Sequence, residues 1–379
     1  MKQRVEFYRH HLGEAEIAAC GEVLRSLFLT TGPVCARFEE EFAAWLGVRQ
    51  VVAVASCTAA LEMSLRALGV GAGDEVITTP MTFIATANAV LQVGAEPVFV
   101  DVEPLTGNLD PARVEEAVTP RTRAVVPVHL YGTLCDMPRL RELADRHGLA
   151  LVSDCAHAVE ARRDGYGSAA MCEAACYSFY ATKNLTCGEG GAVATDDAEL
   201  AERLRRLRLH GMSKGAAERY QGTYRHWDMV ELGFKANLPD VLAALLLPQL
   251  AGLEQRRRRR EEIARRYEAA FTPLAGVDFP RVPPGAVSAR HLFTIWVDRR
   301  DEFLARLQQR GIGVAVNYRA VHLLSYYRRR FGFRPGAFPV AESIGERTLS
   351  LPLYPSLQDH EVERVIQAVR DTARELGLA

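Results

Sequence analysis

The sequence predicts an α/β protein in which a mostly parallel sheet is covered by helices on both faces. Between residues 50 and 195, short apolar runs alternate with segments of helical pattern, and this order of elements is typical of parallel sheets. The runs are rich in Val and Ala and do not alternate between polar and apolar residues. Continuous apolar runs of this length indicate strands that are buried on both faces.

The strands are expected at 51–55, 75–78, 97–100, 123–128, 149–153, 175–179 and 191–194. Helices are expected between them at 59–68, 82–92, 111–118 and 136–146. Two helices have clear beginnings, because Asp110 and Asp136 can cap them and a proline follows each in the first turn. Ligands of such sheets bind beyond the carboxyl ends of the strands, so the residues after each strand are the first candidates for a site.

The chain changes character after residue 195. We expect a basic helix at 197–210, an irregular polar segment at 211–237, and a long helix from about 240 to 270 that bends at Pro248. The proline-rich residues 273–288 predict a linker. A strand at 291–297, a helix at 300–310, strands at 312–316 and 349–351, and a helix at 359–375 then predict a small α+β domain. The expected division is a large domain over 1–250, followed by a connecting helix and small domain over 251–379.

Composition and charge exclude several classes of protein. Hydrophobic residues make up 48% and charged residues 25% of the 379, and the net charge is −1, so neither nucleic acid nor an anionic membrane is expected as the main partner. The beginning of the chain has no signal-peptide pattern, and no apolar run is long enough to span a membrane. The eight cysteines are scattered without metal-ligand spacing, so we expect no metal site and a cytoplasmic enzyme with reduced thiols.

Lys183 is the first candidate for chemistry. An apolar run ends at Phe179, and the lysine follows in a turn of small residues that continues to Gly188-Glu189-Gly190-Gly191. A lysine on a loop is usually a solvated surface residue. The alternative is an amine in a closed pocket, where the suppression of its charge makes it a nucleophile.

Asp154 ends another apolar strand, and His157 follows one helical turn later. The aspartate could cap the next helix, or its carboxylate could hold the protonated nitrogen of a pyridine ring. The histidine could be structural or could touch the same ring. Phe83 could likewise stack on that ring or belong to the core.

The third candidate is the strand-to-helix turn that contains Ser56, Thr58 and Ala59. Its backbone N–H groups could bind a phosphate, although simple capping of the helix explains the same residues. Ser178 could add a hydroxyl to that phosphate. A phosphate cradle, a carboxylate and a lysine in this order are what an enzyme of pyridoxal phosphate (PLP) needs, since the lysine forms a Schiff base with the aldehyde.

Two conspicuous motifs are interpreted as structural. The glycine-rich residues 69–74 precede a strand, so they predict a turn and not a dinucleotide loop. Residues 256–260 are five consecutive arginines, which encircle a helix because successive residues are about 100° apart. We expect a solvated or subunit-facing helix there, in preference to a nucleic-acid site.

With these residues in view, the chain resembles the DegT/DnrJ/EryC1/StrS family of PLP-dependent nucleotide-sugar aminotransferases. The resemblance runs nearly end to end. It is carried by Thr30-Thr31-Gly32-Pro33, the turn at 56–61, Gly73-Asp74-Glu75-Val76-Ile77, the segment 82–88, Asp101-Val102, the segment 127–132, Asp154 with His157, the Lys183 segment, Leu209-His210-Gly211 and the segment 349–355.

The resemblance implies a fold type I architecture and a homodimer with active sites shared between subunits. Its implied cofactor contacts are Lys183, Asp154, His157, Cys57, Thr58, Ala59, Ser178, Phe83 and, from the partner chain, Asn237. Its implied substrate contacts are Thr30, Glu189, Tyr318 and His322. Cys57 departs from the usual Gly or Ala of the cradle, which affects the fit of the substrate more than the chemistry.

The implied reaction moves an amino group from L-glutamate to a keto carbon of a nucleotide-linked keto sugar, with pyridoxamine phosphate as the intermediate form of the cofactor. Residues 182–191 resemble members that aminate C4. A PLP-dependent sugar dehydratase on the same fold is the alternative, although the relatives of that kind replace the lysine with His. A non-catalytic regulator is the third reading.

Overall fold

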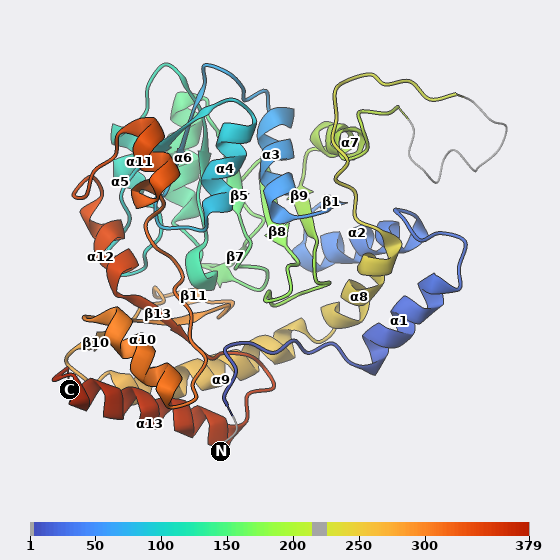
Figure 1. Ribbon diagram of the computed structural model, residues 1–379. Coiled ribbons are helices and arrows are strands. Elements are labelled where there is room, and N and C mark those ends of the chain that lie inside the picture. The colour runs from blue at the N-terminus through green and yellow to red at the C-terminus, as the bar shows by residue number, and fades with distance from the viewer. Residues whose placement is uncertain (1–3, 214–225, 379) are drawn as a thin grey trace.

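The computed structural model describes residues 4–213 and 226–378. Residues 214–225, in the middle of the segment expected to be irregular, lie outside that description. Figure 1 shows a large sheet with helices on both sides, and a smaller sheet beside α10 in the C-terminal part. In the described residues, no helix is both long and apolar enough to cross a membrane.

The central sheet contains all the strands expected between residues 50 and 195. They are β1 (Gln50–Val54), β2 (Glu75–Thr78), β3 (Glu96–Phe99), β4 (Thr122–Val126), β5 (Ala150–Asp154), β8 (Ala174–Ser178) and β9 (Gly191–Thr195). Their order is β1-β9-β8-β5-β4-β2-β3. Strand β9 runs antiparallel to both of its neighbours, and the other pairs are parallel. The prediction of a mostly parallel sheet is therefore confirmed.

Both faces of this sheet are buried, which explains why its strands are continuously apolar. On one face, Val52, Val54 and Val152 pack under α3 (Cys57–Ala67), α4 (Ile84–Gln92) and α7 (Ala198–Leu207). On the other face, Val51 and Tyr177 pack under α2 (Pro33–Leu46) and α8 (Asp240–Leu250). Helix α6 (Met137–His147) covers that second face over β2, β4 and β5, next to α5 (Pro111–Glu116).

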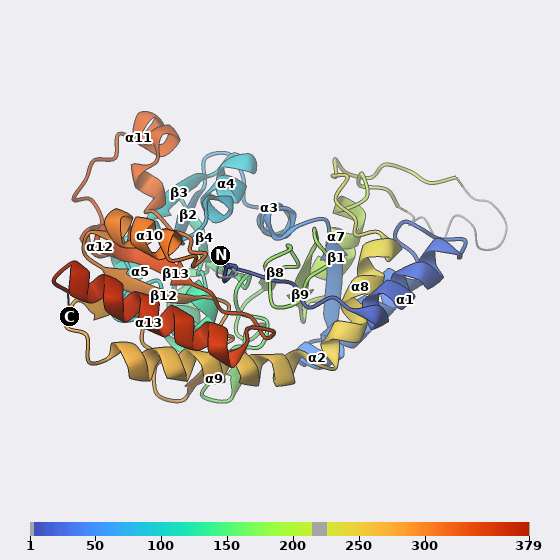
Figure 2. The same ribbon diagram turned by 60° about the horizontal axis from the view of Figure 1, so that its bottom comes forward.

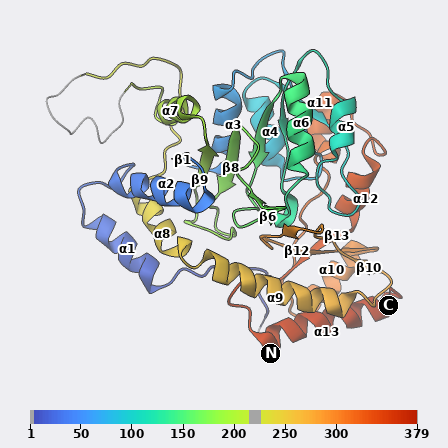
Figure 3. The same ribbon diagram turned by 180° about the vertical axis from the view of Figure 1, so that it is seen from behind.

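The helices expected within this region are present, and the caps work as the sequence indicates. Asp110 accepts a hydrogen bond from the N–H of Ala112, and Asp136 accepts one from the N–H of Arg139. The N-terminal helices α1 (Glu14–Leu24) and α2 were not predicted. Helix α1 lies against α8, as Figures 1 and 3 show.

The long helix expected from 240 to 270 is two helices, and this corrects the prediction of a bend at Pro248. The proline lies inside α8, and the break comes later, at Ala251 and Gly252, before α9 (Leu253–Phe271) begins. The N–H of Gly252 bonds to the carbonyl of Gln249, three residues earlier, and not to that of Pro248 as it would in a continuous α-helix. Figure 2 shows α9 running along the molecule from α8 toward the C-terminal part.

The smaller sheet has the order β10-β12-β13 and consists of β10 (Val277–Asp278), β12 (Phe293–Val297) and β13 (Thr348–Leu351). Helices α9, α10 (Arg300–Gln309) and α13 (Asp359–Glu375) pack on it, and Val5 from the start of the chain joins the same core. The expected strand at 312–316 is wrong, because this segment makes only isolated bridges at Ile312 and Ala315.

The segment expected to be a linker also forms structure. Besides β10 it contains β11 (Ala286–Val287), which pairs with β6 (Arg162–Arg163) in a small sheet completed by β7 (Tyr166–Gly167). Helices α11 (Ser325–Phe331) and α12 (Pro339–Arg347) were also not predicted. The division at residue 250 stays a prediction.

The arginine run does encircle α9, but it is not a wholly solvated face. The side chain of Arg258 is 75% exposed and pairs with Glu254, whereas that of Arg260 is 2% exposed and pairs with Glu160 at 2.5 Å. The expectation of a solvated or subunit-facing helix is therefore wrong for Arg260. A buried guanidinium was not expected because sequence spacing does not show which side of a helix meets a distant carboxylate.

Candidate active site

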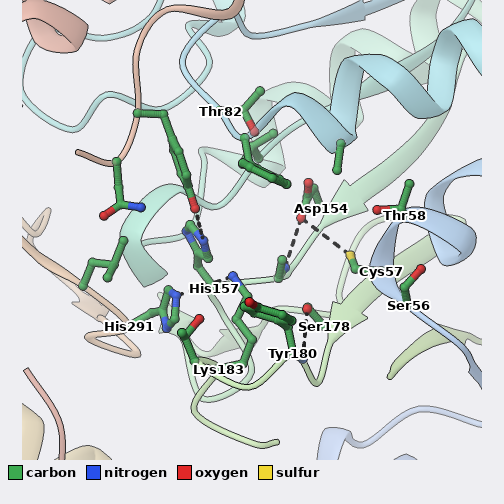
Figure 4. A pocket seen from close by; sticks show the side chains of 18 of the residues that line it. Ser56, Cys57, Thr58, Thr82, Asp154, His157, Ser178, Tyr180, Lys183 and His291 are labelled. Atoms are coloured by element: carbon green, nitrogen blue, oxygen red, sulfur yellow. Dashed lines mark hydrogen bonds between the residues drawn. The ribbon is translucent and has the colours of Figure 1, made fainter. Parts of the chain in front are cut away.

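A cavity of about 560 Å³ lies beyond the carboxyl ends of β1, β5 and β8. Figure 4 shows side chains from these strand ends pointing toward one another across it. Most of the predicted residues line the cavity: Cys57, Thr58, Phe83, Asp154, His157, Ser178, Lys183, Glu189 and Tyr318. The strand ends therefore meet at one edge of the sheet, as expected for ligand sites in such folds.

The N-terminus of α3 forms one end of the cavity. Ser56 caps the helix, since its Oγ accepts a hydrogen bond from the N–H of Ala59 at 3.1 Å. The N–H groups of Cys57 and Thr58, the first helical residues, have no partner within the helix and can bind an anion. Gly191 permits this arrangement, because a Cβ at that position would lie 2.5 Å from the backbone carbon of Ser56.

Ser178 ends β8 close to this turn and lines the same cavity. Its Oγ accepts a hydrogen bond from the N–H of Tyr180 at 3.3 Å, which leaves the hydroxyl hydrogen for another acceptor. The helix terminus and this hydroxyl together form a donor set of the kind that phosphate requires.

Asp154 is the last residue of β5 and is buried. Its Oδ2 accepts from Thr86 Oγ1 at 2.8 Å, and its Oδ1 accepts from the N–H of Ala156 at 3.1 Å. Burial raises the pKa of this carboxyl, and the bonds from Ala156 and Thr86 oppose that rise. The group is thus a buried carboxylate held in one orientation, and a nearby cation would stabilise its charge.

His157 is a neutral donor. Its Nδ1 accepts from the backbone N–H of Tyr131 at 3.2 Å, so the ring hydrogen is on Nε2, which lies 3.1 Å from Tyr318 Oη. Burial, and then the charge of Lys183, lower the pKa of His157 well below its ordinary value. A neutral ring is also the only form whose Nδ1 can accept that backbone hydrogen.

Lys183 lies in the turn after β8, where its backbone N–H bonds to the carbonyl of Tyr180 at 2.9 Å. Its side chain lines the cavity. Burial lowers the pKa of the amine to about 8, and the charge of Asp154 opposes that change. About a tenth of the amine is therefore neutral at pH 7, far more than for a lysine of ordinary pKa, and the neutral form is the nucleophile.

Some predicted residues lie outside the cavity wall. His322 is fully buried and bonds to Glu342 at 2.9 Å through Nε2, so its position does not support a substrate contact. Thr30 is exposed and accepts from Asn237 Nδ2 at 3.2 Å. Ala59 contributes its backbone N–H to the cap of α3.

Two predicted residues lie at the mouth of the cavity. Phe83 is 54% exposed, and its ring centroid lies 5.7 Å from that of Tyr318. Its exposure argues against the alternative reading as a core aromatic. Glu189 is exposed in the turn before β9 and also lines the cavity.

Sequence reasoning missed two residues that contact the reactive groups. Thr86 holds the carboxylate of Asp154 from α4, and the only signal was its place within the segment that carries the resemblance. His291, just before β12, has its Nε2 3.5 Å from Lys183 Nζ. It lies more than a hundred residues from the lysine, so nothing in the local sequence indicated their contact.

The residues present fit pyridoxal phosphate. A donor set for a phosphate, a buried carboxylate for a cationic ring nitrogen and a partly neutral amine for an aldehyde all line one cavity. Phe83 is an aromatic ring at its mouth. The predicted group of Lys183, Asp154 and the α3 terminus is thus brought together by the fold.

The chain is similar along its whole length to known proteins. The chain is 46% identical over 371 residues to the spore coat polysaccharide biosynthesis protein SpsC of Bacillus subtilis, with 96% of this chain and 95% of SpsC covered. The structure of DesV from S. venezuelae matches with a TM-score of 0.92 at 41% identity, covering 98% of this chain and 99% of DesV. Spr1654 from Streptococcus pneumoniae, solved in a PMP form, matches with a TM-score of 0.93 at 31% identity, covering 98% and 100%.

These matches confirm the fold type I architecture that the resemblance implied. Residues 10–370 match the model of a single family. The family and the PMP form of Spr1654 imply PLP as the cofactor. The chain is therefore an aminotransferase and belongs to the DegT/DnrJ/EryC1/StrS aminotransferase family.

Proposed function

We propose that this enzyme transfers an amino group from L-glutamate to a keto carbon, C4, of a nucleotide-linked keto sugar. The observation that carries the proposal is the placement of Lys183, Asp154 and the α3 N-terminus around one cavity. The name of SpsC, a polysaccharide biosynthesis protein, supports a sugar as the acceptor. The likeness of residues 182–191 to members that aminate C4 supports the position.

PLP, when bound, supplies an aldehyde that condenses with amines and a cationic ring that takes up electrons from the adjacent carbon. For this cofactor, the N–H groups of Cys57 and Thr58 and the hydroxyl of Ser178 would hold the phosphate. Asp154 would hold the ring nitrogen, with its carboxylate fixed by Thr86 and by the N–H of Ala156. These contacts would also determine which face of the ring meets Lys183.

Lys183 carries the proton in the reaction that we propose. Its amine is poised near neutral pH because its pKa is about 8, so Nζ can accept a proton from the donor amino acid and return it to a neighbouring atom. One amine can serve as base and then as acid because it reaches both positions from the same side. His157 donates from Nε2 toward Tyr318 and keeps that phenol beside the cavity.

The sugar is proposed to bind beside Asn317 and Tyr318, which line the cavity. Asn317 Oδ1 is buried and makes no hydrogen bond within the described residues. Such an acceptor suits a hydroxyl of the substrate. Glu189 and Thr30 are further candidates for this contact.

We also propose that the enzyme works as a homodimer, with Asn237 of each chain reaching the partner's cofactor phosphate. In its own chain, the Nδ2 of Asn237 donates to the hydroxyls of Thr30 and Thr31. These bonds tie residue 237 to the N-terminal segment and use both hydrogens of its amide, so Asn237 has to release one of them to donate to the partner's phosphate. The cytoplasmic location expected from the sequence stays a prediction.

The decisive experiment supplies the purified protein, loaded with PLP, with glutamate and a panel of nucleotide-linked keto sugars. Mass spectrometry should find a product in which one keto oxygen is replaced by an amino group, together with 2-oxoglutarate. NMR of the product then identifies the aminated carbon. A product that has lost a hydroxyl without gaining nitrogen would instead support the dehydratase, and a protein that binds no PLP would support the regulator.

A further inference from the structure

A chain of polar side chains leads from Lys183 away from the cavity into the protein. His291 Nε2 lies 3.5 Å from Lys183 Nζ, and His291 Nδ1 lies 3.3 Å from Asn184 Oδ1. Asn184 Nδ2 donates to Glu160 Oε2 at 3.0 Å, and Arg260 Nη2 donates to Glu160 Oε1 at 2.5 Å. Figure 4 shows Lys183 and His291 side by side in the cavity.

The amide of Asn184 determines the state of the histidine ring. Its nitrogen donates to Glu160 Oε2 and to the carbonyl of Ala289, at 3.0 Å each, so both of its hydrogens are used. Its oxygen therefore faces His291 as an acceptor, and the ring hydrogen is on Nδ1. Nε2 then presents a lone pair to Lys183, which means that the histidine accepts and the lysine donates.

The charges around this contact favour a neutral histidine. The groups that face Lys183 and His291 come from β5 and the turn after it, the α3 terminus and α9, and they are Asp154, His157, Cys57 and Arg260. The pKa of His291 is well below its ordinary value. Burial is the largest cause of this decrease, and the charge of Lys183 is the second. The rings of His157 and His291 lie 4.4 Å apart between centroids, and both being neutral removes their mutual repulsion.

We propose that His291 is a positioning residue for Lys183, whose amine it holds by accepting a hydrogen bond at Nε2. The inference rests on the proposed function, in which Lys183 moves a proton within the cavity. A neutral amine that donates one hydrogen to His291 has its lone pair and its second hydrogen left for the cavity. The protonated amine keeps the same acceptor, so the nitrogen stays in place in both states.

The buried pair of Glu160 and Arg260 has a place in this arrangement. Burying such a pair contributes little net stability, because the cost of desolvation offsets the attraction. Its geometric effect is specific: Arg260 Nη2 and Nε bond to Glu160 and to the carbonyl of Ala289, the two acceptors of Asn184. The pair therefore holds Asn184 in the orientation that sets the tautomer of His291.

The test compares His291→Leu with His291→Gln in the protein freed of PLP. The rate of PLP capture, followed by visible absorbance, is measured against pH. In wild type the rate should rise with pH through a midpoint near 8, the pKa of Lys183, and level off about one pH unit above that midpoint. His291→Leu should shift this midpoint down by about one pH unit, because the ammonium form loses an acceptor.

His291→Gln should restore most of the wild-type midpoint, since its amide can accept from Lys183 and donate to Asn184 at once. A second readout is the glutamate half-reaction of the loaded enzyme, which should slow about tenfold in His291→Leu and much less in His291→Gln. His147→Gln, at an exposed position on α6, is the matched surface control and should change neither. Melting temperatures confirm that each variant is folded.

Equal midpoints in wild type and His291→Leu would overturn the inference, whatever the activity. Asn184→Leu provides an independent arm that leaves His291 in place. It should lower the midpoint less than His291→Leu does. Without Asn184 the ring of His291 can adopt either tautomer, and the molecules with the hydrogen on Nδ1 still accept from Lys183 at Nε2. Failure of the proposed function would look different: wild type would capture PLP with the expected midpoint and yet convert no keto sugar.

Discussion

The two walls of the cavity come from different parts of the chain. One wall consists of residues at strand ends, where Ser56, Asp154 and Ser178 end or follow β1, β5 and β8. The other includes His291 and the pair Asn317–Tyr318, which come from the C-terminal part of the chain. The first wall carries the candidate reactive groups, and the second is proposed to position them and to bind the sugar.

This difference has a physical origin. The carboxyl ends of parallel strands meet at one edge whatever the loops do, so a reactive group placed there needs only the sheet to form. The second wall depends on how the small sheet and α9 pack against the large one. We therefore expect changes in the first wall to abolish chemistry and changes in the second to alter rates, pH dependence and stability.

The largest effect is expected in the first wall. Lys183→Ala should lower the rate of the glutamate half-reaction by at least about 10³-fold, since it removes the amine that moves the proton. Stopped-flow absorbance of the PLP-loaded protein measures this rate. A variant that kept a rate within tenfold of wild type would show that the proton is carried elsewhere.

The next largest effect is expected at the buried ion pair of Arg260 and Glu160, which lies behind the second wall. Arg260→Met should lower the free energy of unfolding by about 3 kcal/mol, because it leaves the carboxylate of Glu160 buried and unpaired. Urea denaturation measures it. Arg258→Met, in the exposed part of the same run, is the matched control and should change the value by less than about 0.5 kcal/mol. Equal effects of the two substitutions would contradict the buried pair.

The pH dependence of PLP capture sharpens the comparison. The pKa of Lys183 is about 8, so the reactive neutral amine increases as pH rises. Capture by the cofactor-free wild-type protein should be about tenfold faster at pH 9 than at pH 7, because the neutral fraction rises from about a tenth to about nine tenths. Rates that kept rising as steeply above pH 9 would indicate a lysine with an ordinary pKa.

The smallest effect should come from a single hydroxyl. Thr86→Val removes the hydrogen bond to Asp154 Oδ2 and keeps the shape of the side chain. The half-reaction should slow by about fivefold, in line with the ~1 kcal/mol of one such bond. Thr106→Val, a buried threonine that bonds to Glu103 away from the cavity, should leave the rate unchanged. A loss as large as that of Lys183→Ala would mean that Thr86 has a direct part in the chemistry.

Much of the fold followed from local sequence. The strands of the central sheet were predicted because burial on both faces makes them continuously apolar, and the capped helices because Asp and Pro mark their first turns. The strand at 312–316 was wrong, since an apolar run there lies against the core without forming a ladder. The break between α8 and α9 was misplaced because Pro248 was given more weight than Gly252.

The site divides in the same way. Lys183, Asp154 and the turn at 56–59 could be found from the sequence because each follows a recognisable strand, and the strands meet at one edge. His291, Thr86 and the partner of Arg260 could not be found, since their contacts join residues of distant elements. His322 shows the converse, because its place in a promising segment did not bring it to the cavity.

The sequence by itself determined the α/β class, the central strands and the candidate amine and carboxylate of the site, because strand burial and strand ends are local properties. Tertiary structure alone decided that His291 meets Lys183, that Asn184 sets its tautomer and that one arginine of five is buried. The physical reason is that hydrogen bonds and ion pairs are short-ranged and directional. Which partners they join is fixed only when helices and sheets have packed.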